Sequence, residues 1–357
     1  AHLQNGRYDS TRILQDETAR KMRESLFTHD SRLDGMAYGF WRKRYNGHVI
    51  VQHGGDTFWF HSYFVMIPDS NAGFFVSYNT DTAGQVRDEL FEAFLDRYYP
   101  AADAPIEKPL SDFHDRAAHY SGSYGMIRYS HTSAAKIGAL FAVADVTADG
   151  DTLVLKGPTP VPLRFVEVEP LVFREVDGQE KLVFREDSGG RITHLFVGSF
   201  PPVPLERLAW YQTPTFALGL LGVCGVLLAS ALLGWPLAAF LTRGGRGVDT
   251  APTMGSHVAS WIAWIACLAI VAWVVTFLIA MMEPRDLTYG MPPILEAILR
   301  LSPVLAALAA CVLVCAVIAW KNHYWRFSAR LHYTCVLAAC VAMVWFLNYW
   351  NLLRFSA

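Results

Sequence analysis

One stretch, residues 52–60 with the sequence QHGGDTFWF, decides how the first part of the chain is interpreted. It ends an alternating run, residues 48–53, and places two glycines directly after a histidine. Because glycine has no Cβ, Gly54 and Gly55 would let a ligand approach the backbone closely. A structural histidine followed by a glycine-rich turn would produce the same letters, so the stretch by itself leaves both interpretations open.

The residues on either side of this stretch predict strands that are closed by a helix. Tyr45-Asn46-Gly47 links two alternating runs, and an Asn-Gly pair is typical of a type I′ hairpin. Apolar side chains then recur at helical spacing at Val86, Leu90 and Phe94. We therefore expect half of an α+β domain, with its helices and strands at residues 16–26, 36–44, 48–53, 60–67, 73–78 and 82–98.

The order of motifs over about residues 1–100 resembles the C-terminal half of the serine β-lactamase and penicillin-binding-protein superfamily, in particular the class C β-lactamase-like serine hydrolases. The matching segments are Leu3-Gln4-Asn5-Gly6-Arg7-Tyr8, Tyr38-Gly39-Phe40, His53-Gly54-Gly55, Pro68-Asp69 with Gly73, and Asn79 before the last helix. Members of that family have Lys-Thr-Gly or a His-x-Gly variant on the corresponding strand. Gln52 and Trp59 depart from the family pattern, and both departures bear on the shape of the pocket.

The resemblance implies roles for four residues. His53 would line the site of the substrate carboxylate and support the proton network, and Gly54 would adjoin the substrate. Gly55 would let the acyl group lie against the strand, and the backbone N–H of Asp56 would be one of two oxyanion donors. The implied chemistry is acyl-enzyme hydrolysis of a β-lactam, a D-amino-acid peptide or an ester.

The nucleophile and its base are expected outside this chain. In the family, Ser-x-x-Lys and Tyr-x-Asn precede the segment matched here, so the resemblance implies that they lie before Ala1 and that the chain is a fragment. Ser133-Ala134-Ala135-Lys136 matches the nucleophile motif formally, and Tyr349-Trp350-Asn351 matches the second motif. Both follow His53 instead of preceding it, so we interpret them as accidental and expect the chain alone to be inactive.

A linker separates this region from a β-rich one. The sequence Tyr98-Tyr99-Pro100-Ala101-Ala102-Asp103-Ala104-Pro105 is rich in proline and alanine. After it, turn signals such as Asp149-Gly150 and Asp177-Gly178 separate short apolar runs, which predicts a small all-β barrel or sandwich. The predicted strands are residues 138–146, 152–156, 163–168, 171–176, 181–186 and 191–198. A β-rich extension of this kind resembles one appended to some bacterial family members.

Composition indicates that the rest of the chain is membrane-embedded. The chain is 53% apolar and 17% charged, with a mean hydropathy of +0.23. Four charge-free apolar stretches, residues 216–241, 261–282, 301–320 and 331–353, are each long enough to cross a hydrocarbon core of about 30 Å. Glu296 and Arg300 precede the third stretch at i,i+4 spacing, which predicts an ion pair at a helix entrance. We expect His332 to form a hydrogen bond between helices.

The orientation of the spans follows from their short loops, because cytoplasmic loops carry an excess of Lys and Arg. The second loop balances Arg285 against Glu283 and Asp286, whereas the first and third loops carry an excess of basic residues. The basic residues of those two loops are Arg243, Arg246, Lys321, Arg326 and Arg330. We therefore expect residues 1–210 to be extracytoplasmic and the chain to be a multi-pass protein of the bacterial inner membrane.

Charge and cysteine placement exclude several classes of function. Residues 1–210 carry 22 basic and 28 acidic side chains, which disfavours nucleic-acid binding. All six cysteines lie in the apolar second part, and the histidines are scattered, so we expect neither a disulfide framework nor a metal site. No cofactor is expected. The expected partners are a small-molecule or peptide substrate and membrane lipid.

The expected organisation is a partial β-lactamase-like domain at residues 1–100, a linker at 101–108, a β-rich domain at 109–210 and a four-helix transmembrane bundle at 211–357. Two functions remain open. One is the C-terminal part of a membrane-anchored serine hydrolase. The alternative is a non-catalytic envelope module that binds a ligand or a partner. Sequence preceding Ala1 would separate them, because only the hydrolase needs Ser-x-x-Lys and Tyr-x-Asn there.

Overall fold

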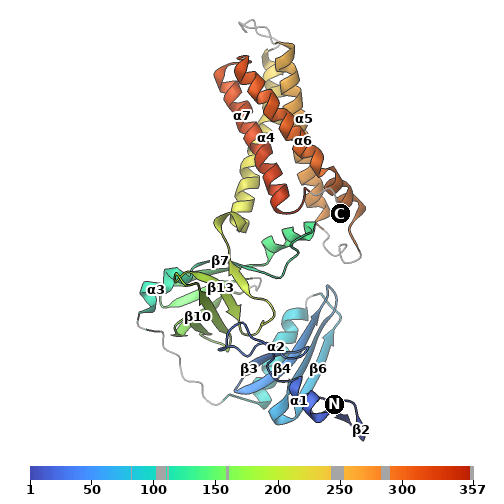
Figure 1. The fold of residues 1–357 in the computed structure, drawn as a ribbon, viewed down its shortest axis with the longest axis vertical. Helices are drawn as coiled ribbons and strands as arrows, with labels where there is room; N and C mark the ends of the chain where they lie inside the picture. The colour runs from blue at the N-terminus through green and yellow to red at the C-terminus, as the bar shows by residue number, and fades with distance from the viewer. Residues whose placement is uncertain are drawn as a thin grey trace. The chain divides into compact units, whose positions relative to one another are not determined.

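The structure is a computed structural model that describes residues 1–81, 83–101, 110, 112–157, 161–242, 253–282 and 290–353 (Figure 1). The chain forms two compact units. The first consists of residues 1–128 and 139–209, and the second of residues 129–138 and 210–357. The predicted linker and the basic residues Arg243 and Arg246 fall almost entirely outside the described residues, as do Glu283, Arg285 and Asp286. The predicted domain boundaries and membrane orientation therefore stay predictions.

The first unit begins with a four-stranded antiparallel sheet in the order β3-β4-β5-β6. Its strands are β3 (Trp41–Tyr45), β4 (His48–Asp56), β5 (His61–Ile67) and β6 (Ala72–Tyr78). The backbone φ angles of Asn46 and Gly47 are 51° and 81°. Both are positive, as a type I′ turn requires, so the predicted Asn-Gly hairpin is confirmed. The expected strand at residues 36–44 is shorter, because Met36 makes only isolated bridges.

Helix α2 (Ala83–Tyr98) packs on one face of this sheet. The buried apolar members of the core between them are Ile50, Tyr63, Val65, Ile67, Phe91 and Leu95, and the buried polar residue Gln52 lies on the same face of the sheet, opposite Val65. The other short elements of this part are β1 (Arg7–Tyr8), β2 (Thr11–Arg12), α1 (Asp16–Lys21) and the 3₁₀ turn η1 (Pro68–Ser70).

The β-rich region is a closed eight-stranded barrel in the order β10-β11-β12-β13-β14-β7-β8-β9. A barrel was one of the two predicted alternatives. The strands are β7 (Gly122–Met126), β8 (Val143–Asp149), β9 (Thr152–Lys156), β10 (Leu163–Glu169), β11 (Val172–Glu175), β12 (Lys181–Glu186), β13 (Ile192–Val197) and β14 (Leu205–Arg207).

One predicted strand of this region is wrong, and two strands were missed. Residues 138–146 are not one strand, because the chain forms a 3₁₀ helix, η2 (Ala134–Phe141), before β8 begins. The missed strands β7 and β14 close the barrel by pairing with each other. β7 contains two glycines and β14 has three residues, so neither shows a periodic pattern in sequence.

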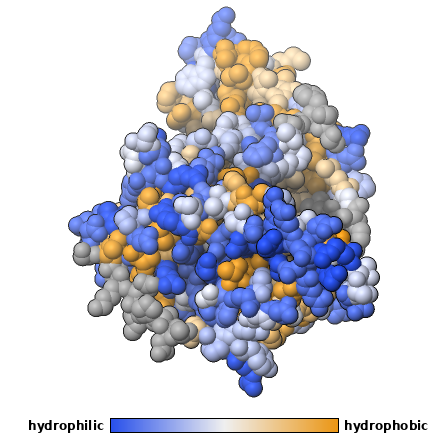
Figure 2. Space-filling model, turned by 60° about the horizontal axis from the view of Figure 1, so that its bottom comes forward, coloured by the Kyte–Doolittle hydropathy of each residue, from blue (hydrophilic) through white to orange (hydrophobic). Residues whose placement is uncertain are grey.

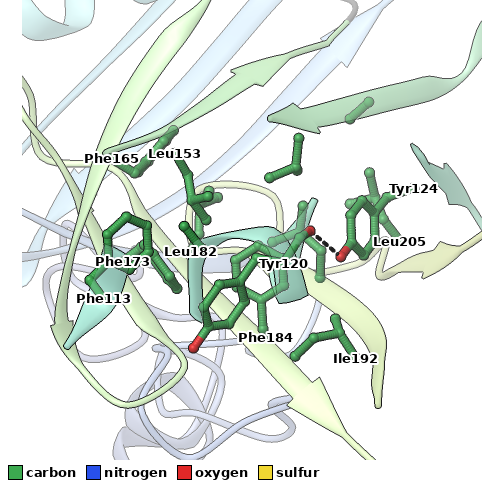
Figure 3. Close-up of a cluster of buried hydrophobic side chains, with 14 residues drawn as sticks. Phe113, Tyr120, Tyr124, Leu153, Phe165, Phe173, Leu182, Phe184, Ile192 and Leu205 are labelled. Carbon is green, nitrogen blue, oxygen red and sulfur yellow. Dashed lines mark hydrogen bonds between the residues drawn. The ribbon is translucent and has the colours of Figure 1, made fainter. Parts of the chain in front are cut away.

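Helix α3 (Phe113–Tyr120) contributes aromatic side chains to the barrel core. Figure 3 shows the rings of Phe113 and Tyr120 among strand residues such as Phe173 and Phe184, with the Tyr124 hydroxyl donating to the backbone oxygen of Tyr120 at 2.6 Å. Such packing of aromatic rings from a helix and from strands supplies most of the apolar area that stabilises a small barrel.

A buried carboxylate fixes α3 to the barrel. Glu167 is fully buried and accepts hydrogen bonds from Arg116 (3.0 Å), from the Tyr120 hydroxyl (2.7 Å) and from the Leu171 N–H (3.0 Å). Its partner Arg116 also bonds Asp112. The Glu167 side chain raises the pKa of Arg116 through that hydrogen bond. All three donors reach Oε1, and Oε2 lies 2.8 Å from Arg116 Nη2 as an ion pair. Removing Arg116 or Tyr120 therefore leaves a buried charge with fewer partners and destabilises the structure.

Among the described residues of the second unit, four helices are long and apolar enough to cross a membrane. They are α4 (Pro214–Thr242), α5 (Met254–Ala280), α6 (Pro293–Lys321) and α7 (Phe327–Tyr349), preceded by the short 3₁₀ turn η3 (Trp210–Gln212). Their number equals that of the predicted spans.

Figure 2 shows one face of the molecule, on which hydrophilic side chains cover most of the surface nearest the viewer.

Two predicted contacts of the bundle are confirmed. Arg300 and Glu296 form an ion pair at the start of α6. His332 on α7 links to α4 through two hydrogen bonds, one with the Ser230 hydroxyl at 2.8 Å and one from the Trp235 indole N–H at 3.0 Å. Because the indole donates to Nδ1, the neutral imidazole carries its proton on Nε2 and donates it to Ser230. His332 therefore does not act as a base toward that serine.

Candidate functional site

The candidate site lies where β4 extends past its neighbour. Strand β3 begins at Trp41, which pairs with Gln52, so β3 does not extend alongside the residues of β4 that follow Gln52. Strand β5 continues to pair with β4 as far as Asp56 opposite His61. In the part of the chain that the structure describes, residues 53–56 therefore have a strand partner on one side only. An unpaired strand edge offers backbone N–H and C=O groups to an extended ligand.

The four predicted site residues divide between the two faces of the sheet. Cross-strand partners share a face, and side chains alternate along a strand. His53 pairs with Phe64 and Gly55 pairs with Ser62, whereas Gly54 pairs with Tyr63, which belongs to the core under α2. His53 and Gly55 thus occupy the face opposite α2, and Gly54 and Asp56 occupy the α2 face.

The His53 side chain is exposed, as a ligand-binding residue must be. Its ring lies 5.6 Å from the ring of Trp41, centroid to centroid, and the Trp41 ring in turn meets Phe200 edge to face at 5.4 Å. Phe75 continues the same face of the sheet opposite Phe64 and is 66% exposed. This face therefore combines an exposed imidazole with one exposed aromatic ring, that of Phe75, whereas Phe64 is half-buried and stacks on Phe40 at 5.8 Å.

Space at Gly55 is limited by one hydroxyl. A Cβ built at Gly55 would lie 2.9 Å from Ser62 Oγ, whereas a Cβ at Gly54 would make an ordinary contact of 3.5 Å with Arg87 Nη1. The φ angle is outside the left-handed region at both positions, so backbone conformation requires neither glycine, and only Gly55 is restricted by steric room. Any side chain at Gly55 would project into the open face beside His53.

The Asp56 carboxylate is held on the α2 side by a guanidinium and an imidazole. Arg87 Nη1 donates to both carboxylate oxygens at 2.8 and 3.0 Å, and the imidazole Nδ1 of His61 lies 2.7 Å from Oδ1. Burial opposes ionisation, yet the hydrogen bonds from His61 and Arg87 hold the pKa of Asp56 below its usual range. The Arg87 guanidinium also lies over the Tyr63 ring at 5.2 Å. The end of β4 is thereby fastened to the first turns of α2.

The Asp56 contact also determines the tautomer of His61. Because Nδ1 faces a carboxylate, it carries the proton, and Nε2 is left as an acceptor. Nε2 is buried and has no hydrogen-bond partner in the described residues. The side chains of His61 and Arg87 are 13% and 12% exposed, so both act from within the hairpin and the helix and not from the open face.

Gln52, one departure from the family pattern, is explained by the core. Gln52 is buried, and its side-chain oxygen accepts a hydrogen bond from the Tyr63 hydroxyl. Burial raises the pKa of Tyr63, so the hydroxyl stays protonated and remains a donor. The amide therefore satisfies a polar group that would otherwise be buried without a partner.

Sequence reasoning missed Ser62, His61 and Arg87. The first two could have been found from the hairpin, because a loop centred on residues 58–59 places His61 opposite Asp56. Arg87 gave no such signal, because its approach depends on the angle at which α2 crosses the sheet. Among the described residues, no group of three or more His, Cys, Asp or Glu side chains is arranged to hold a metal ion.

The formal nucleophile motif belongs to a different unit from the one expected. Residues 129–138, which include Ser133 and Lys136, group with the four long apolar helices and not with the barrel. The Ser133 hydroxyl pairs with that of Ser130 at 2.7 Å. Lys136 Nζ donates to the backbone oxygen of Tyr349 at 2.5 Å. The two formal motifs are thus in contact with each other, and Lys136 caps the C-terminal end of helix α7.

Comparisons with known proteins add little to this geometry. No family model and no curated protein sequence matches the chain. Structural similarity was found to SurE bound to D-Leu, with 20% identity and a TM-score of 0.33 over 55% of this chain and 44% of that one, and to a second SurE structure at the same identity and score. An octameric penicillin-binding protein homologue from Pyrococcus abyssi is 16% identical, with a TM-score of 0.24 over 57% and 44% of the two chains. The chain spans less than half the length of each.

Proposed function

We propose that residues 1–100 form the substrate-lining half of a serine hydrolase domain that works through an acyl-enzyme and is anchored by the four helices. The observation that carries the proposal is the open edge of β4 at residues 53–56, which has an exposed histidine and a glycine on one face. A serine nucleophile supplied by polypeptide N-terminal to residue 1 would approach this edge. The substrate class is a β-lactam, a D-amino-acid peptide or an ester.

The residues of the edge have separate roles in this proposal. The backbone of residues 53–56 binds the extended part of the substrate, and His53 contacts its carboxylate. Gly55 leaves room for the acyl group, and the Asp56 N–H donates to the oxyanion that develops on the tetrahedral intermediate. The paired nucleophile and base would come from Ser-x-x-Lys and Tyr-x-Asn segments. The Asp56 side chain takes no part in the chemistry, because Arg87 and His61 hold it on the α2 side.

The open face of the sheet supports the same proposal. Exposed Phe75 and half-buried Phe64 lie opposite α2, on the face that carries His53. Aromatic side chains on a sheet face normally pack against a second layer. The remainder of a two-layered hydrolase domain would supply that layer and would bring the nucleophile to the edge. We place the soluble part on the extracytoplasmic side of a bacterial inner membrane.

The test uses the longer natural polypeptide with a fluorophosphonate probe and a fluorescent penicillin. We expect a covalent adduct on a serine upstream of residue 1, and we expect Gly55→Ala to slow acylation at least tenfold because its Cβ occupies the acyl site. Gly157→Ala is the matched control, since a Cβ there meets only Ala144 at 3.9 Å. A polypeptide that binds wall-derived ligands without any adduct, and whose upstream sequence lacks Ser-x-x-Lys, would be the non-catalytic envelope module instead.

A further inference from the structure

Residues 129–138 are part of the second unit although they connect two strands of the barrel. They follow β7 and lead through η2 into β8, yet their contacts are with the end of α7. The segment contains both a lysine and several aromatic or hydroxyl side chains, in the order Tyr129, Ser130, His131, Thr132, Ser133 and Lys136. Linking β7 to β8 does not by itself explain why this connection packs on the end of α7.

Lys136 stabilises the C-terminal end of α7. Its Nζ donates to the backbone oxygen of Tyr349, the last residue of the helix. The last carbonyls of a helix lack intrahelical partners and carry partial negative charge, so an ammonium group is favourable there. The same Nζ lies 4.2 Å from the centroid of the Tyr349 ring and 5.8 Å from that of Trp350. Both rings add a cation–π contribution.

Asn351 makes a second contact between residues 129–138 and the end of α7. The contacts of Lys136 and Asn351 together are called the clasp below. Its φ angle is 57°, the left-handed conformation that commonly ends a helix. From that position the side-chain amide donates to the backbone oxygen of His131 at 3.0 Å and lies 3.4 Å from that of Ser133. Ser133 in turn accepts from the Ala135 N–H at 3.3 Å at the start of η2. The residues of the formal nucleophile motif are therefore used to cap two helices.

The clasp lies at a level expected for lipid headgroups. Helix α7 has 23 residues, about 34 Å at 1.5 Å per residue, so its end reaches the boundary of a hydrocarbon core. Aromatic rings surround that end: Tyr349 stacks on Trp345 at 5.5 Å and meets Tyr211 edge to face at 6.1 Å. Tyr and Trp are enriched at this level because their rings have an apolar body and a polar edge.

Apolar side chains follow the clasp within the same 3₁₀ helix. After Lys136, η2 has the sequence IGALF, and its last residue, Phe141, is 83% exposed. Alanine, leucine and phenylalanine on a short helix that begins at the membrane boundary are suited to the layer between headgroups and acyl chains. A lysine at the start of such a segment is also favourable beside phospholipid phosphates.

We propose that residues 129–141 are an interfacial membrane segment, clasped to the end of α7 by Lys136 and Asn351, and that the apolar side chains of η2 insert into the headgroup layer of the bilayer. The partner is phospholipid. The inference does not depend on the proposed hydrolase activity, because it uses only the contacts of residues 129–138 within the second unit and the exposure of Phe141 at the end of the continuous helix η2.

The test places the photoreactive residue benzoylphenylalanine at position 141 in the full chain, reconstituted into vesicles of phosphatidylcholine and phosphatidylglycerol. We expect phospholipid adducts, identified by mass spectrometry, at least fivefold above those from the same residue at position 75. Phe75 is the matched control, since it is an exposed phenylalanine on β6. Equal lipid capture at the two positions, or none at 141, would overturn the proposal.

A second pair of variants tests the clasp. Lys136→Met keeps most of the side-chain volume and removes the ammonium group, so it should lower lipid capture at position 141 at least threefold. Lys156→Met removes an exposed lysine at the end of β9 and should leave capture unchanged. Unchanged capture in Lys136→Met, with the variant inserted in the membrane as well as the parent chain, would show that Lys136 does not hold the segment in place.

Discussion

Replacing Arg87 by methionine should loosen the end of β4 without unfolding the sheet. Methionine keeps an apolar stem of similar length, so the change removes mainly the guanidinium. Two hydrogen bonds to Asp56 at 2.8 and 3.0 Å are lost, together with the stacking over Tyr63 at 5.2 Å. His61 remains as a partner for Asp56.

The magnitude follows from the exposure of the two partners. Hydrogen bonds to charged groups contribute about 1.5–3 kcal/mol when buried. Arg87 is 12% exposed, but the Asp56 side chain is 53% exposed and can be rehydrated, so the pair is worth about 1.5 kcal/mol. The cation–π contact adds about 0.5 kcal/mol. A total of about 2 kcal/mol corresponds to about a thirtyfold increase in local opening, at 1.4 kcal/mol per factor of ten.

Hydrogen exchange measured by mass spectrometry on the full chain in detergent reports this opening. Amides of residues 53–62 should exchange about thirtyfold faster in Arg87→Met, while barrel amides stay unchanged. Arg97→Met, an exposed arginine at the end of the same helix, should change exchange less than threefold. The reasoning fails if the two variants exchange alike, or if the barrel loses protection to the same extent as the hairpin.

Three further results are expected. Glu167→Ala should accelerate exchange in α3 about a hundredfold, because removing one partner of a buried ion pair costs about 3 kcal/mol, whereas exposed Glu169→Ala should have little effect; equal effects would refute the role of Glu167. Asp56→Asn should reduce the protection of residues 53–62 at pH 7, and this effect should shrink as pH falls below about 4. The lowered pKa of Asp56 makes its contribution complete above about pH 4 and removes it as pH falls through the native value, so a difference that persists in acid would contradict the ion pair. His332→Leu should lower the melting temperature of the detergent-solubilised chain, whereas Thr334→Val should lower it less; the reverse order would show that the link to Ser230 and Trp235 contributes nothing.

Local patterns were sufficient to predict elements whose periodicity is strong. The Asn46-Gly47 hairpin, the four apolar helices and five of the barrel's strands correspond to runs of sequence with turn residues or uniform apolarity between them. The predictions that failed concern short segments without a clear periodic pattern. η2 is apolar and short, so residues 138–146 resemble a strand. β7 and β14 form strands by pairing with each other, which closes the barrel.

The sequence by itself determined that His53, Gly54, Gly55 and Asp56 lie together at the end of a strand, because neighbouring residues cannot be separated. Only the tertiary structure decided what surrounds them. Because β3 begins only at Trp41, opposite Gln52, one edge of this segment has no strand partner among the described residues. The angle at which α2 crosses the sheet brings Arg87 to Asp56. The meeting of Lys136 with Tyr349, 213 positions later, has no local signature either, because it depends on the chain returning through four helices to the same level. Such contacts follow from the packing of whole elements, which no short stretch encodes.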